Sequence, residues 1–470
     1  MPNRPAPSDN QLENFKSKVM TPPIVETPLK SSPTCILALL VALSLTSPAA
    51  WCGPVAPANK PNIIIILADD VGYGDLSCYG STEHRTPHLD TLAREGMRFT
   101  DFHANGPMCS PTRAALLTGR YQQRSGLEEV LGYGDRGLPL EARTIAEYLR
   151  AAGYATGIYG KWHLGYPPEI PTRQGFDDFR GYLYGDSDHH SRIDRNGNED
   201  WWHNEMLAME EGYNTYLINR DSLRFIEQHQ GKPFFLYVAH SAVHFPWQGP
   251  HDKADRVKGG DYNSNAKYGS RTDPRVALGE MLEAIDDGVG QIVTKLRELR
   301  LEERTLVFFT SDNGGYVRVS SNGPLRGEKG SMYEGGHREP AIAWWPGRIK
   351  PDTVCRETTM TMDLLPTALD LCGQPLPRGP LKLDGVSLVP VLSGKRLPAR
   401  TLFWRYDARK AARQGPWKLV VTDTKLELFN LDKDLGEQDD LADRYPKIVK
   451  RLSRELAAWE KSVNADGGFN

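Results

Sequence analysis

Cys109 lies in the run Met-Cys-Ser-Pro-Thr-Arg at residues 108–113, where a loop is predicted to turn into a helix. Pro111 suits a first helical turn, since its fixed φ fits there and its missing N–H would have no partner anyway. Ser110 is the expected N-cap. Cys109 would then lie beside unpaired N–H groups at the positive end of the helix dipole, which attract anions and lower the pKa of a thiol. The pattern predicts a reactive side chain, although a buried structural cysteine on a capped helix also fits so short a motif.

Two adjacent carboxylates, Asp69 and Asp70, directly follow the apolar run at residues 61–67. Such a continuous run, rich in isoleucine, is typical of a parallel strand buried on both faces. Paired carboxylates behind a buried strand would repel each other and lack solvent unless a cation lay between them. Asp312 and Asn313 follow a second such run in the same way. We therefore expect a hard-cation site, the alternative being an exposed Asp-Asp turn.

Basic and imidazole side chains also follow predicted strands. Lys161 and His163 come after residues 155–159, and His244 comes after residues 232–240. Ligands of open α/β sheets bind outside the carboxyl ends of the strands. Taken singly, each Lys or His could be a solvated charge or a structural residue, but polar groups behind four predicted strands indicate an active site at one sheet edge.

Strands and helices alternate along most of the chain, which is typical of an α/β fold. We predict a large, mostly parallel mixed sheet sandwiched by helices, followed by a smaller C-terminal α+β domain with an antiparallel sheet and a helix. The expected boundaries are 1–50 for a signal peptide and leader, 51–396 for the catalytic α/β domain and 397–470 for the C-terminal domain. Further helices are predicted at 86–96, 144–152, 275–299, 362–372 and 446–461, and further strands at 97–102, 341–345, 401–406, 417–422 and 426–430.

The N-terminal region contains a short apolar run at residues 35–45, followed by small residues. This run is too short to span a bilayer but suits a secretory signal cleaved near residues 49–50, with a signal anchor as the alternative. Translation could start at Met1 or Met20. We expect an exported protein, periplasmic or secreted, without a stable membrane span in the mature chain.

Charge and cysteine content narrow the functional classes further. A net charge of -3 argues against a nucleic-acid partner, which would favour a basic excess. Cys78, Cys109, Cys355 and Cys372 are too few for a disulfide framework in so long an exported chain. Whether Cys355 and Cys372 pair stays open at this point.

Taken together, these motifs resemble the type I sulfatases, the formylglycine-dependent, arylsulfatase-like members of the alkaline phosphatase superfamily. The resemblance extends from residue 61 to about residue 436, and its blocks are 69–75, 109–120, 160–165, 244–246, 311–315 and 329–336. It implies that the chain hydrolyses sulfate esters. It also implies that a maturation enzyme oxidises Cys109 to formylglycine, whose aldehyde hydrate attacks the ester.

The same resemblance implies a role for each site residue. The calcium ligands would be Asp69, Asp70, Asp312 and Asn313, with the modified Cys109 as a further ligand. An all-oxygen set suits one Ca2+, although Mg2+ stays open. Arg113, one helical turn after Cys109, would help the metal to hold the hydrate. Lys161 and Lys329 would bind the sulfate, His244 would protonate the leaving oxygen, and His163 would be the base that releases the sulfate.

The expected substrate is a sulfated carbohydrate rather than a small aryl sulfate. The Trp- and His-rich segment 186–203 is predicted to be a surface insertion. This segment and the later segment 247–273 could stack on sugar rings. Two alternatives remain. One is a phosphomonoester or phosphodiester hydrolase of the same superfamily, although the Asp-Asp and Asp-Asn sets lack the histidines of a two-zinc site. The other is a catalytically inactive relative that binds sulfated glycans.

Overall fold

Residues 60–465 are described by a computed structural model in which an eleven-stranded sheet forms the centre. Its strands are β1 (Asn62–Ala68), β2 (Met97–His103), β3 (Ala155–Lys161), β4 (Asp178–Tyr182), β5 (Trp202–His203), β6 (Met206–Leu207), β7 (Phe234–Ala239), β8 (Thr305–Ser311), β9 (Arg338–Trp344), β10 (Thr353–Cys355) and β11 (Thr359–Met360). They lie in the order β10-β2-β9-β8-β1-β7-β3-β4-β5-β6, with β11 beside β2.

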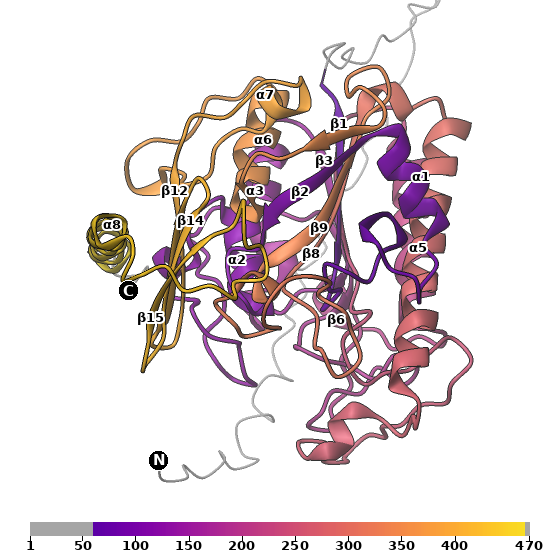
Figure 1. Ribbon diagram of the computed structural model, residues 1–470. Coiled ribbons are helices and arrows are strands. Elements are labelled where there is room, and N and C mark those ends of the chain that lie inside the picture. Colours follow the sequence, from indigo (N-terminus) through magenta and orange to yellow (C-terminus); the bar gives the residue numbers. More distant parts are fainter. Residues whose placement is uncertain (1–59, 466–470) are drawn as a thin grey trace, which may run out of the picture. The chain divides into compact units, whose positions relative to one another are not determined.

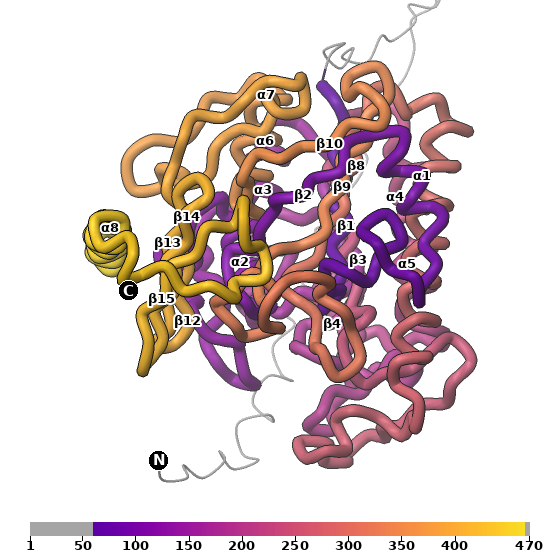
Figure 2. Tube along the Cα trace, in the orientation of Figure 1, coloured from indigo at the N-terminus to yellow at the C-terminus, as the bar shows by residue number. Residues whose placement is uncertain are grey.

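The middle of this sheet is parallel, as the sequence predicts. β8, β1, β7, β3 and β4 run in one direction, so their carboxyl ends share one edge. The strand predicted at 341–345 starts earlier, at Arg338, and is antiparallel to both β8 and β2. In Figure 2 this orange segment lies beside the indigo β2, far from it in sequence.

Helices cover both faces of the large sheet. Along β1, Ile63 and Ile65 belong to one apolar core and Ile64 and Ile66 to the other, which explains why the run is apolar at every position. The first core contains α2 (Cys109–Thr118), α3 (Ile145–Ala151), α6 (Leu364–Leu371) and the short α7 (Val389–Leu392). The second contains α1 (Pro87–Glu95), α4 (Asn214–Gln228) and α5 (Pro274–Glu298), and Figure 1 shows α1 and α5 on the side opposite α2.

A smaller antiparallel sheet follows, with a helix on its outer side. It consists of β12 (Thr401–Tyr406), β13 (Arg409–Gln414), β14 (Trp417–Val421) and β15 (Leu426–Asn430), and α8 (Pro446–Ala465) packs on it. Ala115 of α2 belongs to the same apolar core, so α2 lies between the two sheets. The sequence analysis did not predict β13 or α4. β13 buries the small Ala411 and Ala412 and the charged Arg413, so it has no apolar run, whereas α4 has apolar residues at helical spacing and could have been found.

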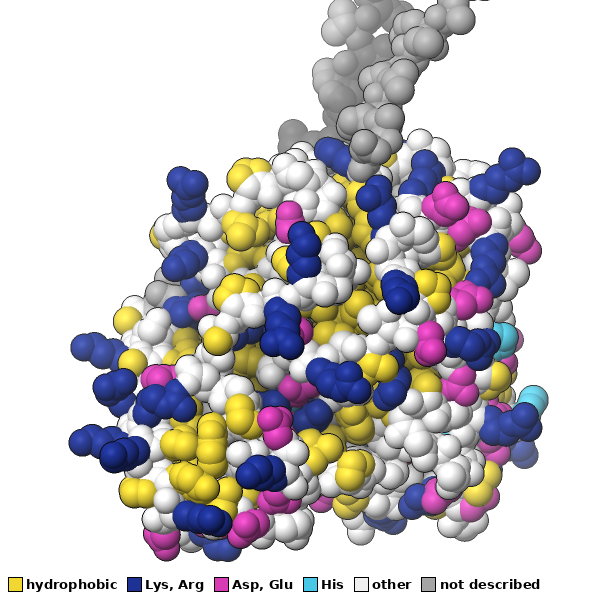
Figure 3. All heavy atoms as spheres, turned by 45° about the horizontal axis from the view of Figure 1, so that its top comes forward, with side chains coloured by type: hydrophobic (Ala, Val, Ile, Leu, Met, Phe, Trp, Pro, Cys, Tyr) yellow, Lys and Arg dark blue, Asp and Glu magenta, His cyan; other side chains and the backbone are white. Residues whose placement is uncertain are grey.

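Within residues 60–465 no helix is long and apolar enough to cross a membrane. The signal peptide predicted from residues 35–45 lies outside the described residues. Cys355 and Cys372 are both free thiols, so they do not pair. On the face shown in Figure 3, basic side chains stand out singly, with acidic and apolar side chains between them.

Candidate active site

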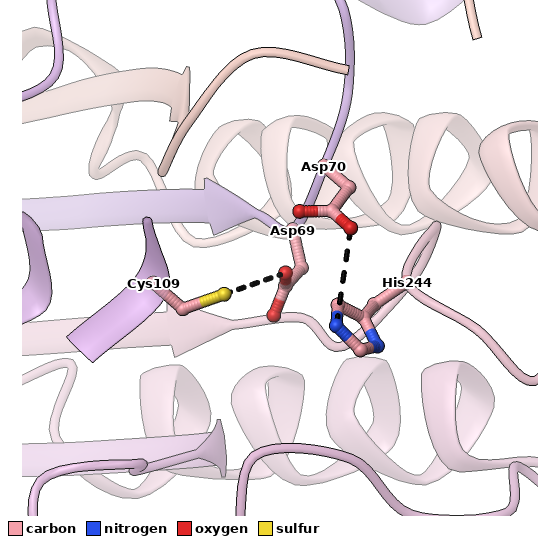
Figure 4. A group of neighbouring side chains, drawn as sticks. All are labelled: Asp69, Asp70, Cys109 and His244. Atoms are coloured by element: carbon pink, nitrogen blue, oxygen red, sulfur yellow. Dashed lines mark hydrogen bonds and ion pairs between the residues drawn. The ribbon is translucent and has the colours of Figure 1, made fainter. Parts of the chain in front are cut away.

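The carboxyl ends of four neighbouring strands bring the sequence-predicted residues together. Asp69 and Asp70 follow β1, Lys161 ends β3, and Asp312 follows β8, while His244 lies in the loop after β7. α2 adds Cys109 and Arg113, and the loop before β9 adds Lys329. Figure 4 shows Asp69 between Cys109 and the His244 imidazole, with Asp70 facing that ring.

Cys109 is the first residue of α2 and is buried. The N-cap is Met108, so the prediction of Ser110 as the cap is wrong; the Ser110 hydroxyl instead accepts a hydrogen bond from the Leu131 amide at 3.2 Å. The Cys109 Sγ lies 3.6 Å from Asp69 Oδ1 and 3.5 Å from Lys329 Nζ.

The predicted lowering of the thiol pKa is also wrong. Burial, with the nearby Asp69 carboxylate, raises the pKa of Cys109 to about 12, and this outweighs the opposing effect of Lys161 and Lys329. An unmodified Cys109 would thus be a protonated thiol and a poor nucleophile at neutral pH.

Three cationic side chains form ion pairs with the three carboxylates of the site. Lys161 Nζ is 2.5 Å from Asp69 Oδ2, and Lys329 Nζ is 2.6 Å and 2.8 Å from the two oxygens of Asp70. The fully buried Arg113 donates to Asp312 Oδ2 at 2.8 Å and 3.1 Å and to Asp69 Oδ2 at 3.0 Å. Because six formal charges cancel, the cluster is close to neutral.

The pKa values of the three carboxylates differ in direction despite these ion pairs. Burial alone would raise the pKa of Asp69, but Lys161 and Arg113 hold it below its usual range. Burial together with Asp69 raises the pKa of Asp312 to about 6, and burial outweighs Lys329 in raising the pKa of Asp70. Asp70 and Asp312 therefore gain from further positive charge.

The donor set fits a hard divalent cation. The Asn313 side chain donates to Asp70 Oδ1 at 2.7 Å, while its own buried carbonyl oxygen has no hydrogen-bond partner. An unpaired buried oxygen beside carboxylates is what an oxygen-preferring cation requires. A second group of potential ligands, His103, Glu334 and His337, does not fit a metal, because Arg413 and Lys418 already contact these side chains.

The two site histidines have defined tautomers. His163 Nε2 lies 3.1 Å from the Leu131 carbonyl, which can only accept, so Nε2 carries the proton and the buried Nδ1 is left without a partner. In His244, Nδ1 lies 2.8 Å from the Phe245 carbonyl, and Nε2 lies 3.9 Å from Asp70 Oδ2. Burial and neighbouring lysines lower the pKa of both rings well below the usual value, so both are neutral.

The backbone around the site is unusual in ways that sequence reasoning did not predict. Asp70 has φ 62° and His163 has φ 50°, a left-handed conformation that non-glycine residues adopt rarely and often at functional sites. Glycines allow the loops to close: a Cβ on Gly314 would lie 1.9 Å from the Gly335 carbonyl oxygen, and one on Gly185 would lie 2.6 Å from the His163 ring.

A pocket of about 540 Å³ opens onto Cys109, His163, His244 and Lys329. Segment 186–203 is not the surface insertion predicted from the sequence, since Asp186, Asp188 and His189 are buried. Segments 186–203 and 247–273 pack together, and each supplies a cation to the pocket lining. The lining side chains that the sequence analysis did not single out include Tyr184, Arg195, Phe245, Lys267, Tyr268 and Tyr406. Most of them lie in the loops that follow β4 and β7, and that position could have been used to predict them.

Carboxylates and cations that meet at the carboxyl edge of a mostly parallel sheet are typical of the active site of an α/β enzyme. Residues 61–374 match the sulfatase family model, and residues 327–462 match the model described as N-sulphoglucosamine sulphohydrolase, C-terminal. The chain belongs to the sulfatase family and is a sulfate ester hydrolase.

Individual relatives cover most of the chain. It is 37% identical over 413 residues to N-acetylgalactosamine-6-sulfatase of Canis lupus familiaris, covering 81% of this chain and 74% of that protein. It is 39% identical over 392 residues to arylsulfatase A of Homo sapiens, with coverage of 76% and 72%. Among solved structures, Ps i-CgsB in complex with k-i-k-neocarrahexaose superposes with a TM-score of 0.77 at 31% identity, covering 85% of this chain and 93% of that one.

Proposed function

We propose that the enzyme removes sulfate from a sulfated carbohydrate, with Cys109 as formylglycine and one Ca2+ at the carboxylate cluster. The observation that carries the proposal is the burial of Cys109 among Asp69, Lys329 and the other site charges, where a thiol would be protonated and inert. Once oxidised, the same position would supply the hydrate oxygen that attacks sulfur.

Asp69, Asp70, Asp312 and Asn313 would hold the cation, together with residue 109. The unpaired Asn313 oxygen and the raised pKa values of Asp70 and Asp312 support this set. A bound Ca2+ would supply positive charge to an otherwise neutral cluster, which favours binding of an anionic sulfate.

Lys161, Lys329 and Arg113 would neutralise the charge on the sulfate oxygens. Both lysine Nζ atoms lie on site carboxylates, and Lys329 Nζ also lies 3.5 Å from Cys109 Sγ, so they border the position where the sulfur atom must sit. Arg113 is fixed by two carboxylates and also donates to the Lys161 carbonyl at 3.2 Å, so it is held in place without reorganisation.

His244 and His163 would handle the protons. The pKa of His244 is lowered by burial and then by Lys329 and Lys161, and a sulfate bound to those lysines would reverse their effect. His244 Nε2 could then carry the proton needed by the leaving oxygen. His163 offers a free Nδ1 lone pair, which would accept the proton that must be lost as sulfate is released.

The proposal of a carbohydrate substrate is based on the pocket lining and on the relatives. The pocket is broad and lined by Tyr184, Tyr268 and Tyr406, which suit the apolar faces of sugar rings. N-acetylgalactosamine-6-sulfatase and the neocarrahexaose complex of Ps i-CgsB point to the same class. We further propose export to the periplasm or outside the cell, and a C-terminal domain at 397–470 that completes the pocket through Tyr406.

Mass spectrometry of the tryptic peptide spanning residues 99–113 tests the proposal. Conversion of Cys109 lowers the mass by about 18 Da relative to the thiol, as a covalent change of the nucleophile. We expect this species in protein from the native host and a loss of sulfatase activity in Cys109→Ala. A homogeneous free thiol in active enzyme would contradict the proposal.

A further inference from the structure

Two cations line the pocket near His244. Arg195 and Lys267 come from segments 186–203 and 247–273, and both lie against one aromatic ring, that of Phe245. The Arg195 guanidinium carbon is 5.6 Å from the ring centroid, and Lys267 Nζ is 5.7 Å from it. Phe245 in turn contacts the His244 imidazole, with 4.0 Å between ring centroids. If His244 protonates the leaving oxygen, these cations face the sugar that carries that oxygen.

The charge around these cations is not balanced within the pocket lining. Asp70 is the only carboxylate among the lining residues, and Lys329 occupies both of its oxygens. Lys267 makes no ion pair with any carboxylate of the described residues 60–465. It lies instead over Tyr268, 5.0 Å from the ring centroid. An ammonium stacked on aromatic rings without a counter-charge is well placed to receive an anion.

One buried carboxylate, Asp186, fixes the Arg195 side chain directly and the Lys267 backbone indirectly. Asp186 accepts from Arg195 Nε and Nη2, at 2.7 Å in the shortest contact, and also pairs with the fully buried Arg256 at 3.3 Å. Arg256 donates to the Lys267 carbonyl at 3.0 Å. Asp186 therefore fixes Arg195 directly and the backbone of Lys267 through Arg256. Arg195 and Arg256 thus share Asp186 as their carboxylate partner.

We propose that Arg195 and Lys267 form a second anion subsite, which binds a carboxylate or a further sulfate on the sugar next to the ester that is cleaved. The inference rests on the proposed function, since it takes the His244 side of the pocket as the leaving-group side. The preferred substrate is then a glycan with at least two anionic groups, such as a uronate-containing or multiply sulfated one. A singly sulfated neutral sugar would fill the pocket without meeting these cations.

Three synthetic disaccharides test the subsite. They share one sulfate ester, and the neighbouring sugar carries no charge, a carboxylate or a second sulfate. Charge-assisted hydrogen bonds contribute enough that Lys267→Met should lower kcat/KM about tenfold to a hundredfold on at least one of the charged disaccharides. The loss on the uncharged one should be far smaller. Lys253→Met, on the same loop and exposed, removes the same charge outside the pocket lining and is the matched control.

Binding provides a measurement that does not depend on turnover. In Cys109→Ala, calorimetry should give tighter binding of the carboxylate or disulfated disaccharide than of the uncharged one, and adding Lys267→Met should remove most of that difference. Which charged disaccharide gains identifies the anion. Equal affinity of all three disaccharides in Cys109→Ala, or equal kcat/KM losses in Lys267→Met, would overturn the subsite. Selective binding without turnover of any disaccharide by wild type would leave the subsite standing and contradict the proposed function instead.

Discussion

At the scale of single residues, the site is governed by which charges are compensated. Asp69 is stabilised by its ion pairs with Lys161 and Arg113, whereas Asp70 and Asp312 carry raised pKa values, the latter to about 6. A cation between them would offset the burial and the repulsion that raise these pKa values. The same burial makes an unmodified Cys109 thiol unreactive, so one electrostatic condition supports both the proposed metal and the proposed modification.

Asp70→Asn should remove most of the bound metal. It deletes one negative ligand while keeping the side-chain shape and the hydrogen bond from Asn313. The loss in metal affinity should exceed the ~10–100-fold typical even of residues that only orient a metal ligand. Elemental analysis after dialysis measures it, with the exposed Asp443→Asn as the control. Full metal occupancy in Asp70→Asn would exclude Asp70 from the ligand set.

His244→Ala should affect poor leaving groups most. A general acid typically supplies ~10²–10⁴-fold in rate, and a basic sugar alkoxide needs that proton far more than an activated aryl oxide does. The expected loss in kcat/KM is therefore large on a sugar sulfate and small on nitrophenyl sulfate. Metal content and formylglycine occupancy must match wild type in both assays. Equal losses on the two substrates would assign His244 a structural role and make Lys161 or Lys329 the next candidate acid.

At the scale of elements, sequence patterns predicted the central strands better than their surroundings. The continuous apolar runs that form β1, β7 and β8 predict a parallel sheet covered by helices on both faces. The polar residues that follow these parallel strands then lie at one edge of the sheet. By contrast, β13 carries arginines and small residues whose burial depends on partners far away in sequence, so local pattern could not reveal it. The cap of α2, the burial of segment 186–203 and the positive φ values at Asp70 and His163 likewise depend on tertiary contacts.

The start of α1 illustrates such a tertiary contact and gives a prediction. Thr86 makes no side-chain cap, and the buried Asp286 of α5 instead accepts hydrogen bonds from the Leu89 amide at 2.7 Å and the His88 amide at 3.0 Å. Asp286→Ala leaves the buried Leu89 amide and the part-buried His88 amide unpaired, so the free energy of unfolding should fall by about 1–3 kcal/mol. Urea unfolding measures this. The neighbouring Asp287→Ala, whose side chain is mostly exposed, should change it little.

At the scale of the whole molecule, buried charges join the two sheets. Arg413 of β13 donates to both oxygens of Asp101 on β2, at 2.6 Å and 2.7 Å. Lys418 of β14 lies 2.8 Å from Glu334, in the loop before β9, and 3.0 Å from Glu437. These contacts hold the small sheet against the large one, and the small sheet in turn supplies Tyr406 to the pocket. The junction thus connects the stability of the C-terminal sheet to the shape of the active site.

Glu437 makes this junction sensitive to pH. Its buried carboxylate accepts a hydrogen bond from the Glu334 amide at 2.6 Å, and burial together with Glu334 outweighs Lys418 in raising the pKa of Glu437 from 4.5 to about 7. Between these two values the folded protein keeps a proton that the unfolded chain has lost. The contribution of Glu437 to the free energy of unfolding therefore falls as the pH rises through this window and levels off above it.

Glu437→Gln should flatten that dependence, because glutamine does not titrate and keeps an oxygen for the Glu334 amide. The expected result is a smaller change in the urea midpoint between about pH 5 and about pH 7.5 than in wild type. The exposed Asp439→Asn serves as the control and should retain the wild-type slope. Because Lys418 would keep Glu334 as its partner, the variant should remain folded at neutral pH. An unchanged slope in Glu437→Gln would show that other groups set the pH dependence of the junction.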